Sequence, residues 1–199
     1  MYIKLFEKKI DRNFDSLKEY QNLDAKFFFS IEKLMTENFW SLMIGNYVSS
    51  ITISNHILER LLKLALIYNE SLGEDDEKSL KAYNKYQGMA LRNTITNCFN
   101  KKLISIVQKK HLEETINEMI RNGFSHSSFE SVLGKSSPRI PAIMGNIYSQ
   151  ETQKVEIDRR ILVSISEMQI EQFAEKNAFE YYRYLYNLIK QFEDCLKPE

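Results

Sequence analysis

Residues 57–67 have the sequence Ile-Leu-Glu-Arg-Leu-Leu-Lys-Leu-Ala-Leu-Ile, which is strongly apolar and carries charges only at positions 59, 60 and 63. Such a stretch, free of proline and glycine, is typical of a helix that is largely buried. We expect it to form the later half of a long helix from about residue 39 to residue 72, which Gly73 would end. Within this helix Glu59 precedes Lys63 by four positions, the order that favours an ion pair on a helix surface.

The sequence on both sides of this stretch also favours helices. All three prolines lie after residue 137, and the first 137 residues contain only five glycines. Few helix breakers predict long helices. Aromatic residues at positions 173, 179, 182, 186 and 192 look like the core face of the last helix. We expect the other helices at about 3–20, after a cap at Asp24, at 78–99, at 101–122 and from a capping box at Ser166 to about Leu196.

The least helical part of the chain is the segment 134–165. It contains Pro138, Pro141 and Gly145, and residues 154–158 alternate between charged and apolar side chains. This segment is either a structured loop or a small hairpin. The sequence as a whole therefore predicts one domain over residues 1–199, an all-α up-and-down bundle with an N-terminal helical extension at 1–37 and an irregular insertion at about 129–165.

Residues 38–58 form a segment of 21 residues without a charge, which we call the uncharged segment. It contains nine residues that are asparagine, serine, threonine or histidine, too many for a helix that faces lipid. Two interpretations stay open. The segment is either a core helix, whose small residues allow close packing, or the face of a dimer.

The composition limits the classes of function. Lysine plus arginine and aspartate plus glutamate both number 27, so the net charge is zero, and any contact with nucleic acid must come from a local patch. Cys98 and Cys195 are far apart and have no metal-binding spacing, which predicts free thiols in a reducing cytoplasm. The first residues contain no apolar run of the kind found in secretory signals. We therefore expect a cytoplasmic protein that is not inserted in a membrane.

The residues most suggestive of chemistry are Arg121, Asn122 and His126. Arginine offers a fork of donors that matches a phosphate, histidine exchanges protons near neutral pH, and asparagine can orient either group. On an unbroken helix the side chains at 121 and 126 would point roughly 140° apart. Gly123 can end the helix after Asn122, so that His126 returns towards Arg121. The trio suits metal-independent cleavage of RNA through its 2′-hydroxyl group.

This candidate site contains one histidine, whereas concerted cleavage needs both a base and an acid. His56 and His111 have no comparable neighbours in the sequence. In a two-fold dimer, an isologous interface would place two copies of Arg121 and His126 in one cleft. We therefore expect a homodimer with a composite site.

The pattern Arg121-Asn122-x-x-x-His126, at a helix end in an all-helical chain, resembles the signature of the HEPN superfamily. The segment 57–63 also resembles the acidic, leucine-rich part of an early HEPN core helix. This resemblance, over roughly residues 40–196, implies a helical bundle, a homodimer and a metal-independent ribonuclease that acts as a toxin or as an effector against phage. Ser128 stands where many HEPN toxins have a tyrosine. An antitoxin or another regulatory protein is an expected partner, because an unrestrained RNase would harm its host.

Further candidates for substrate binding are Glu59, Lys109, Lys110 and Ser125, and we expect neither a metal nor a cofactor. The lysines could attract the RNA backbone, or they could simply form the solvated face of a helix. For Glu59 the ion pair with Lys63 is the simpler interpretation. The alternative to an enzyme is a non-catalytic helical module that binds nucleotide, RNA or a protein partner in a defence or regulatory complex.

Overall fold

Helices dominate the computed structural model, which confirms the all-α prediction. The structure describes residues 2–72, 74–114, 116, 139–145, 152–158 and 163–197. The described elements are α1 (Tyr2–Leu17), the 3-10 helix η1 (Lys18–Tyr20), α2 (Phe29–Met43), α3 (Tyr47–Ser71), α4 (Asp76–Tyr86), α5 (Leu91–Asn100), α6 (Ile106–His111), β1 (Arg139–Gly145), β2 (Thr152–Asp158) and α9 (Val163–Leu196).

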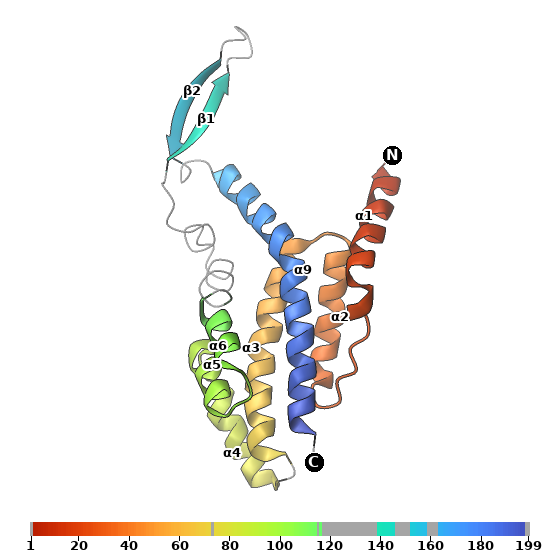
Figure 1. Ribbon diagram of the computed structural model, residues 1–199, viewed down its shortest axis with the longest axis vertical. Helices are drawn as coiled ribbons and strands as arrows, with labels where there is room; N and C mark the ends of the chain where they lie inside the picture. Colours follow the sequence, from red (N-terminus) through yellow and green to blue (C-terminus); the bar gives the residue numbers. More distant parts are fainter. Residues whose placement is uncertain are drawn as a thin grey trace.

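The centre of the bundle is α3. It contacts α2, α4, α5 and α9, and its most extensive contact is with α9. Figure 1 shows α2, α3 and α9 side by side, with α4, α5 and α6 on one flank and α1 on the other. Leu61, Leu62, Ala65 and Leu66 are fully buried in this arrangement. The apolar stretch at 57–67 therefore lies in the middle of the hydrophobic core.

Two predicted helices are each divided by a turn. The prediction of one continuous helix at 39–72 is wrong, because the chain turns at residues 44–46 between α2 and α3. Gly45 in this turn has a φ of +76°, a left-handed conformation that glycine adopts without steric cost. The helix expected at 78–99 is likewise divided into α4 and α5, with Gly88 in the gap. One glycine costs a helix only about 1 kcal/mol, so the sequence pattern alone did not reveal these turns. Gly73 lies outside the described residues.

Three polar side chains of the uncharged segment are completely buried and bind one another. Asn38 of α2 donates to Ser54 Oγ at 2.8 Å and accepts from Ser50 Oγ at 2.6 Å, both on α3. Each buried group has a partner, so the network joins the two helices at little cost. These residues support the core interpretation. Trp40 in the same segment is 59% exposed, and the dimer face stays a prediction. No helix of the described part of the chain is long and apolar enough to cross a membrane.

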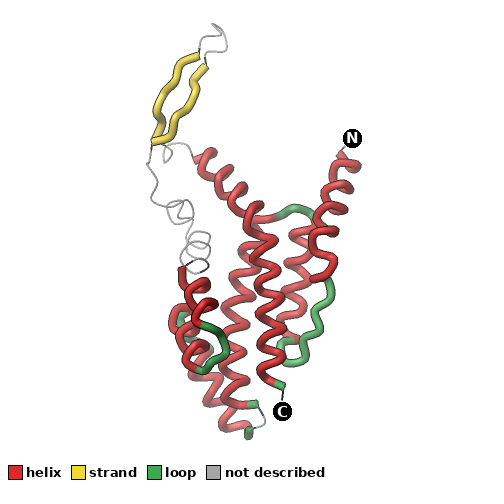
Figure 2. Tube along the Cα trace, viewed as in Figure 1, coloured by secondary structure: helices red, strands yellow, loops and turns green. Residues whose placement is uncertain are grey.

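The last helix holds the N-terminal segment in place. Tyr182 and Tyr186 are buried, as the aromatic pattern predicts, and their hydroxyls donate to the backbone carbonyls of Tyr20 and Asn22. Leu17, at the end of α1, is fully buried in the same core. Figure 2 shows the loop between η1 and α2 running along the bundle before α2 begins. The segment expected as an N-terminal extension thus contributes to the core.

A carboxylate of α9 caps the start of α2. Glu193 is 6% exposed, and its Oε1 accepts the backbone N–H groups of Phe27 and Phe28 at 2.8 and 2.9 Å. Donors at the start of a helix have no partner within it, and no local side chain caps α2. The expected cap at Asp24 is wrong, because α2 begins only at Phe29 and its cap comes from the far end of the chain.

The segment between the bundle helices contains a hairpin. β1 and β2 pair in antiparallel fashion, with Arg139 opposite Asp158 and Gly145 opposite Thr152. The hairpin alternative for the run at 154–158 is confirmed, and Figure 1 shows the hairpin standing away from the bundle. α9 then begins at Val163, so the predicted cap at Ser166 is wrong.

We predict that Glu193→Gln lowers the free energy of unfolding by about 2 kcal/mol, because the neutral amide accepts the N–H groups of Phe27 and Phe28 more weakly than the carboxylate does. Urea denaturation followed by circular dichroism measures this change. Asp194→Asn is the matched control, since Asp194 is exposed and pairs only with Lys197 at the surface. Equal stability of the two variants would contradict a capping role for Glu193.

Candidate functional site

The predicted catalytic residues Arg121, Asn122 and His126, together with Ser125, lie outside the described residues. The structure does describe the chain that leads to them. α6 continues as a π-helical turn at residues 112–114 and 116, and both Leu112 and Ile116 are buried in the core. The chain therefore runs towards the motif from an anchored position. The predicted start of the helix at residue 101 is wrong, because α6 begins only at Ile106.

A capping box sets where α6 starts. The Ser105 hydroxyl accepts the N–H of Gln108, and the Gln108 side chain accepts the N–H of Ser105. The Gln108 amide also donates to Gln191 of α9 at 2.6 Å. Gln191 in turn donates to the carbonyl of Leu103 at 2.8 Å. These bonds fix α6 against α9, the long helix that follows the motif in the sequence.

Lys109 and Lys110 lie at the end of α6, where their environments differ. Lys109 Nζ is 3.9 Å from Glu113 Oε1 and 5.1 Å from the centre of the Phe99 ring. Lys110 is exposed and has no hydrogen bond or ion pair among the described residues. Lys109 is therefore partly engaged inside the protein, and Lys110 is the cation that solvent reaches. A role of either lysine in binding RNA stays a prediction.

His111, the next residue, packs as an aromatic side chain. Its ring lies 5.0 Å from that of Tyr184 in an edge-to-face arrangement. Burial lowers the pKa of His111, so its imidazole is neutral at pH 7. The Tyr184 hydroxyl is buried and has no hydrogen-bond partner among the residues that the structure describes. Burial also raises the pKa of this hydroxyl, which keeps it neutral.

Glu59 lies on α3 at the edge of an open groove between α3 and α4. Its carboxylate is 3.2 Å from Lys63 Nζ, which confirms the predicted ion pair. The sequence pattern predicted no other side chain next to Glu59. In the structure His56, Arg60, Tyr83 and Gln87 line the same groove.

A second cluster of charges escaped the sequence analysis. Glu70 at the end of α3 accepts hydrogen bonds from Lys85 and Tyr86 of α4, at 2.8 and 2.6 Å. Lys101, after α5, lies 2.7 Å from the same oxygen. No local spacing reveals this cluster, since Lys85 is 15 positions from Glu70. Lys101 precedes the motif in the sequence, and its ammonium group is paired with Glu70 within the protein.

The pKa of Glu70 reflects both its burial and its partners. Burial alone would raise the pKa, but the hydrogen bonds from Lys101, Lys85 and Tyr86 outweigh it and lower the pKa to about 2. Glu70 is therefore ionised at neutral pH. The cluster joins α3 to α4 and to the turn after α5.

Neither cysteine belongs to a disulfide, which confirms the prediction of free thiols. Cys98 is buried, and burial raises the pKa of its thiol to about 12, so this sulfur is unreactive. Cys195 is exposed near the end of α9. Within the described ranges, no group of three or more histidine, cysteine, aspartate or glutamate side chains could hold a metal ion.

No protein-family model, no curated protein and no solved structure matches this chain. Its function must therefore be argued from the chemistry of its own residues.

We predict that Glu70→Gln destabilises the protein in a pH-dependent way. The folded-state pKa of Glu70 is about 2, below its ordinary value of 4.5, so its contribution is fully present above pH 4.5 and is lost as the pH falls towards 2. We expect a loss of about 1–2 kcal/mol at pH 7, reduced by solvent screening of the exposed Lys85. Urea denaturation at pH 7 and at pH 3 measures both values. A difference between wild type and variant that does not shrink at pH 3 would contradict this account.

Proposed function

We propose that this chain is a metal-independent endoribonuclease of HEPN type. The observation that carries the proposal is the sequence Arg121-Asn122-x-x-x-His126, because no other arginine–asparagine pair in the chain is followed so closely by a histidine. The all-helical bundle is the scaffold that a HEPN protein requires, and this agreement supports the proposal. The enzyme acts as a cytoplasmic toxin or phage-defence effector, under the control of an antitoxin or another regulator.

In the proposed reaction His126 takes the proton of a ribose 2′-hydroxyl, and the oxygen attacks the adjacent phosphorus. The bond to the 5′-oxygen breaks, and this oxygen receives a proton from the His126 of a second copy. Arg121 binds the phosphate and stabilises its developing negative charge. Asn122 orients the phosphate or the imidazole. The products carry a 2′,3′-cyclic phosphate and a 5′-hydroxyl end.

The other two histidines of the chain bear on this assignment of roles. His111 is the histidine closest to the motif in sequence, but its ring is packed against Tyr184 and its pKa is lowered by burial. His56 lies on the α3–α4 side of the bundle. A second copy of His126 is therefore the simplest source of the second proton-transfer group.

We predict that the purified protein cleaves RNA in the presence of EDTA and that His126→Ala lowers the cleavage rate by at least about 100-fold, since a positioned acid or base typically contributes that much. Gel analysis with mapped product ends measures the rate and detects the cyclic phosphate. Circular dichroism checks that the variant is folded. RNA binding without any cleavage by the wild type would instead favour the non-catalytic module.

Arg121→Ala should reduce cleavage by a comparable factor, because arginine is the phosphate-binding group of the proposed site. Arg92→Ala is the matched control. Arg92 is also followed by asparagine, but it lies exposed on α5 and has no histidine five positions later. Equal loss of activity in the two variants would show that the arginine of the motif has no special role.

A composite site makes a separate prediction about mixed dimers. A dimer of one wild-type subunit and one His126→Ala subunit keeps only one of the two histidines that the proposed reaction uses, so it should be nearly as inactive as the His126→Ala homodimer. Cleavage assays on wild type mixed with increasing amounts of the variant measure the loss, and differently tagged subunits confirm exchange. Mixed dimers that keep half of the wild-type activity would place the complete site within one chain.

A further inference from the structure

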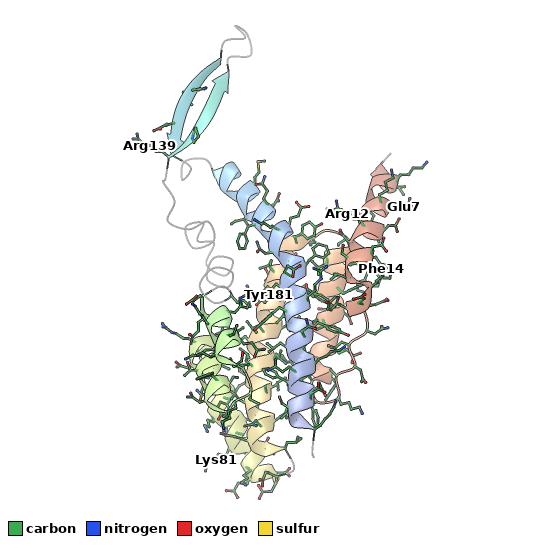
Figure 3. The ribbon with its side chains drawn as sticks, in the orientation of Figure 1. Glu7, Arg12, Phe14, Lys81, Arg139 and Tyr181 are labelled. Carbon is green, nitrogen blue, oxygen red and sulfur yellow. The ribbon has the colours of Figure 1, made fainter. Side chains whose placement is uncertain are left out.

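The hairpin of β1 and β2 has free edges that another strand could extend. The two strands contact chiefly each other, and among the described residues they form a sheet of two strands. Figure 3 shows Arg139 at the end of the hairpin nearer to the bundle, so both strands extend away from the helices. A hairpin of two strands is only marginally stable in water, and further strands stabilise it. A strand added at a free edge would therefore stabilise this hairpin.

Pro141 makes the two edges of the hairpin different. It lies in β1 opposite Glu156 of β2, and proline has no N–H group. A proline fits within a strand when its nitrogen faces the free edge, because no hydrogen bond of the ladder is then lost. The free edge of β1 is therefore interrupted near its middle. β2 has the sequence Thr-Gln-Lys-Val-Glu-Ile-Asp over residues 152–158, without proline or glycine, and presents a continuous edge.

The position of Pro141 also determines which residues of β2 face its free edge. In an antiparallel ladder, two opposite residues direct their N–H and C=O groups either towards each other or away from each other, in alternation along the strands. Because the nitrogen of Pro141 faces outwards, the backbone groups of Glu156 opposite it face the free edge of β2. The alternation directs the backbone groups of Lys154 to the same edge and those of Val155 to β1. Lys154 and Glu156 are therefore the central positions at which a new strand would form hydrogen bonds.

The charges at these two positions make β2 complementary to a second copy of itself. When two copies of β2 pair in antiparallel fashion with Val155 at the centre, Lys154 of each copy lies opposite Glu156 of the other. Both residues are exposed, and Lys154 has no ion pair among the described residues. Glu156 is 3.9 Å from Arg139, and an exposed pair of this kind contributes little to stability. The register that matches the backbone groups therefore also matches the charges, since opposite charges across two strands attract.

Other registers fit less well. A pair of strands centred on Lys154 would place the two lysines opposite each other, and a pair centred on Glu156 would do the same with the two carboxylates. A shift by one residue would place backbone groups that face the edge opposite groups that face β1, and Val155 would lie opposite residues of the other face. The sequence of β2 therefore favours one register with a second copy.

We propose that β2 pairs with β2 of a second copy of this chain, in antiparallel fashion and centred on Val155, so that the two hairpins form one sheet of four strands. The contact is isologous, and each Lys154–Glu156 pair therefore occurs twice. The proposed ribonuclease requires a second copy of the chain but does not specify the surface through which the copies meet. The strand contact is argued from the hairpin alone and holds whether or not the chain cleaves RNA.

Disulfide cross-linking of the full chain tests this register. In a Cys195→Ser background, which removes the exposed native thiol, Val155→Cys should give a covalent dimer, because directly opposite residues have Cβ atoms about 4.5–5.5 Å apart. Gln153→Cys is the matched control. Position 153 lies on the same face of β2, but its two copies would be four residues apart along the strands, roughly 13 Å. Non-reducing gel electrophoresis measures the rate. No cross-linking at position 155, or equally fast cross-linking at position 153, would overturn the proposal.

An exchange of charges tests the same contact without a covalent bond. Lys154→Glu places carboxylates opposite each other in both pairs and should raise the dissociation constant of the dimer about 10-fold in sedimentation equilibrium at low salt. Adding Glu156→Lys restores opposite charges and should restore the affinity. Both positions are exposed, so the variants should fold like the wild type. A wild type that is monomeric at every concentration, a dimer that Lys154→Glu does not weaken, or a double variant as weak as the single one would also overturn the proposal.

Discussion

The bond between Glu193 and the start of α2 is the constraint on which the arrangement of the helices depends. A single carboxylate oxygen from α9 accepts the N–H groups of Phe27, which is partly buried, and of Phe28, which is fully buried. The tyrosines of α9 bind the preceding loop at the same time. The two ends of the chain are thereby joined along one helix. Once α2 is placed in this way, Asn38 reaches Ser50 and Ser54 and sets the position of α3.

The position of α3 then determines which cationic side chains form ion pairs and which stay accessible to solvent. Glu70 gathers Lys85 and Lys101 at one end of the helix, and Glu59 pairs with Lys63 nearer its middle. These pairs neutralise cations that the sequence alone would count as available to nucleic acid. Other cations have no ion pair among the described residues. Arg60 is one of them, and it faces a groove with an exposed tyrosine.

Much of the fold could be predicted from the sequence because the scarcity of proline and glycine leaves helices as the main choice. The boundaries could not, because a turn at Gly45 depends on how two helices pack and not on local preference. The cap of α2 was missed for a related reason: Glu193 lies 165 positions from Phe28, beyond any local pattern. Glu59 shows the opposite case, since a spacing of four residues on a helix determines its partner. The chemistry of the motif is still predicted from sequence alone, since Arg121 and His126 lie outside the described residues.

The distribution of cations bears on how a ribonuclease of this kind would recognise RNA. Affinity for a phosphate backbone grows with the number of cations that contact it. Here Lys101 and Lys109 are directed towards carboxylates, so the segment 101–111, which precedes the motif, offers the RNA backbone little beyond Lys102 and Lys110. A broad electrostatic track is therefore absent from this described part of the surface. Recognition by the proposed ribonuclease would then rely on specific contacts such as that of the Arg121 guanidinium with the phosphate. If the proposed function holds, such an enzyme would discriminate by local fit, because a weak general attraction for nucleic acid limits cleavage of RNA that does not fit.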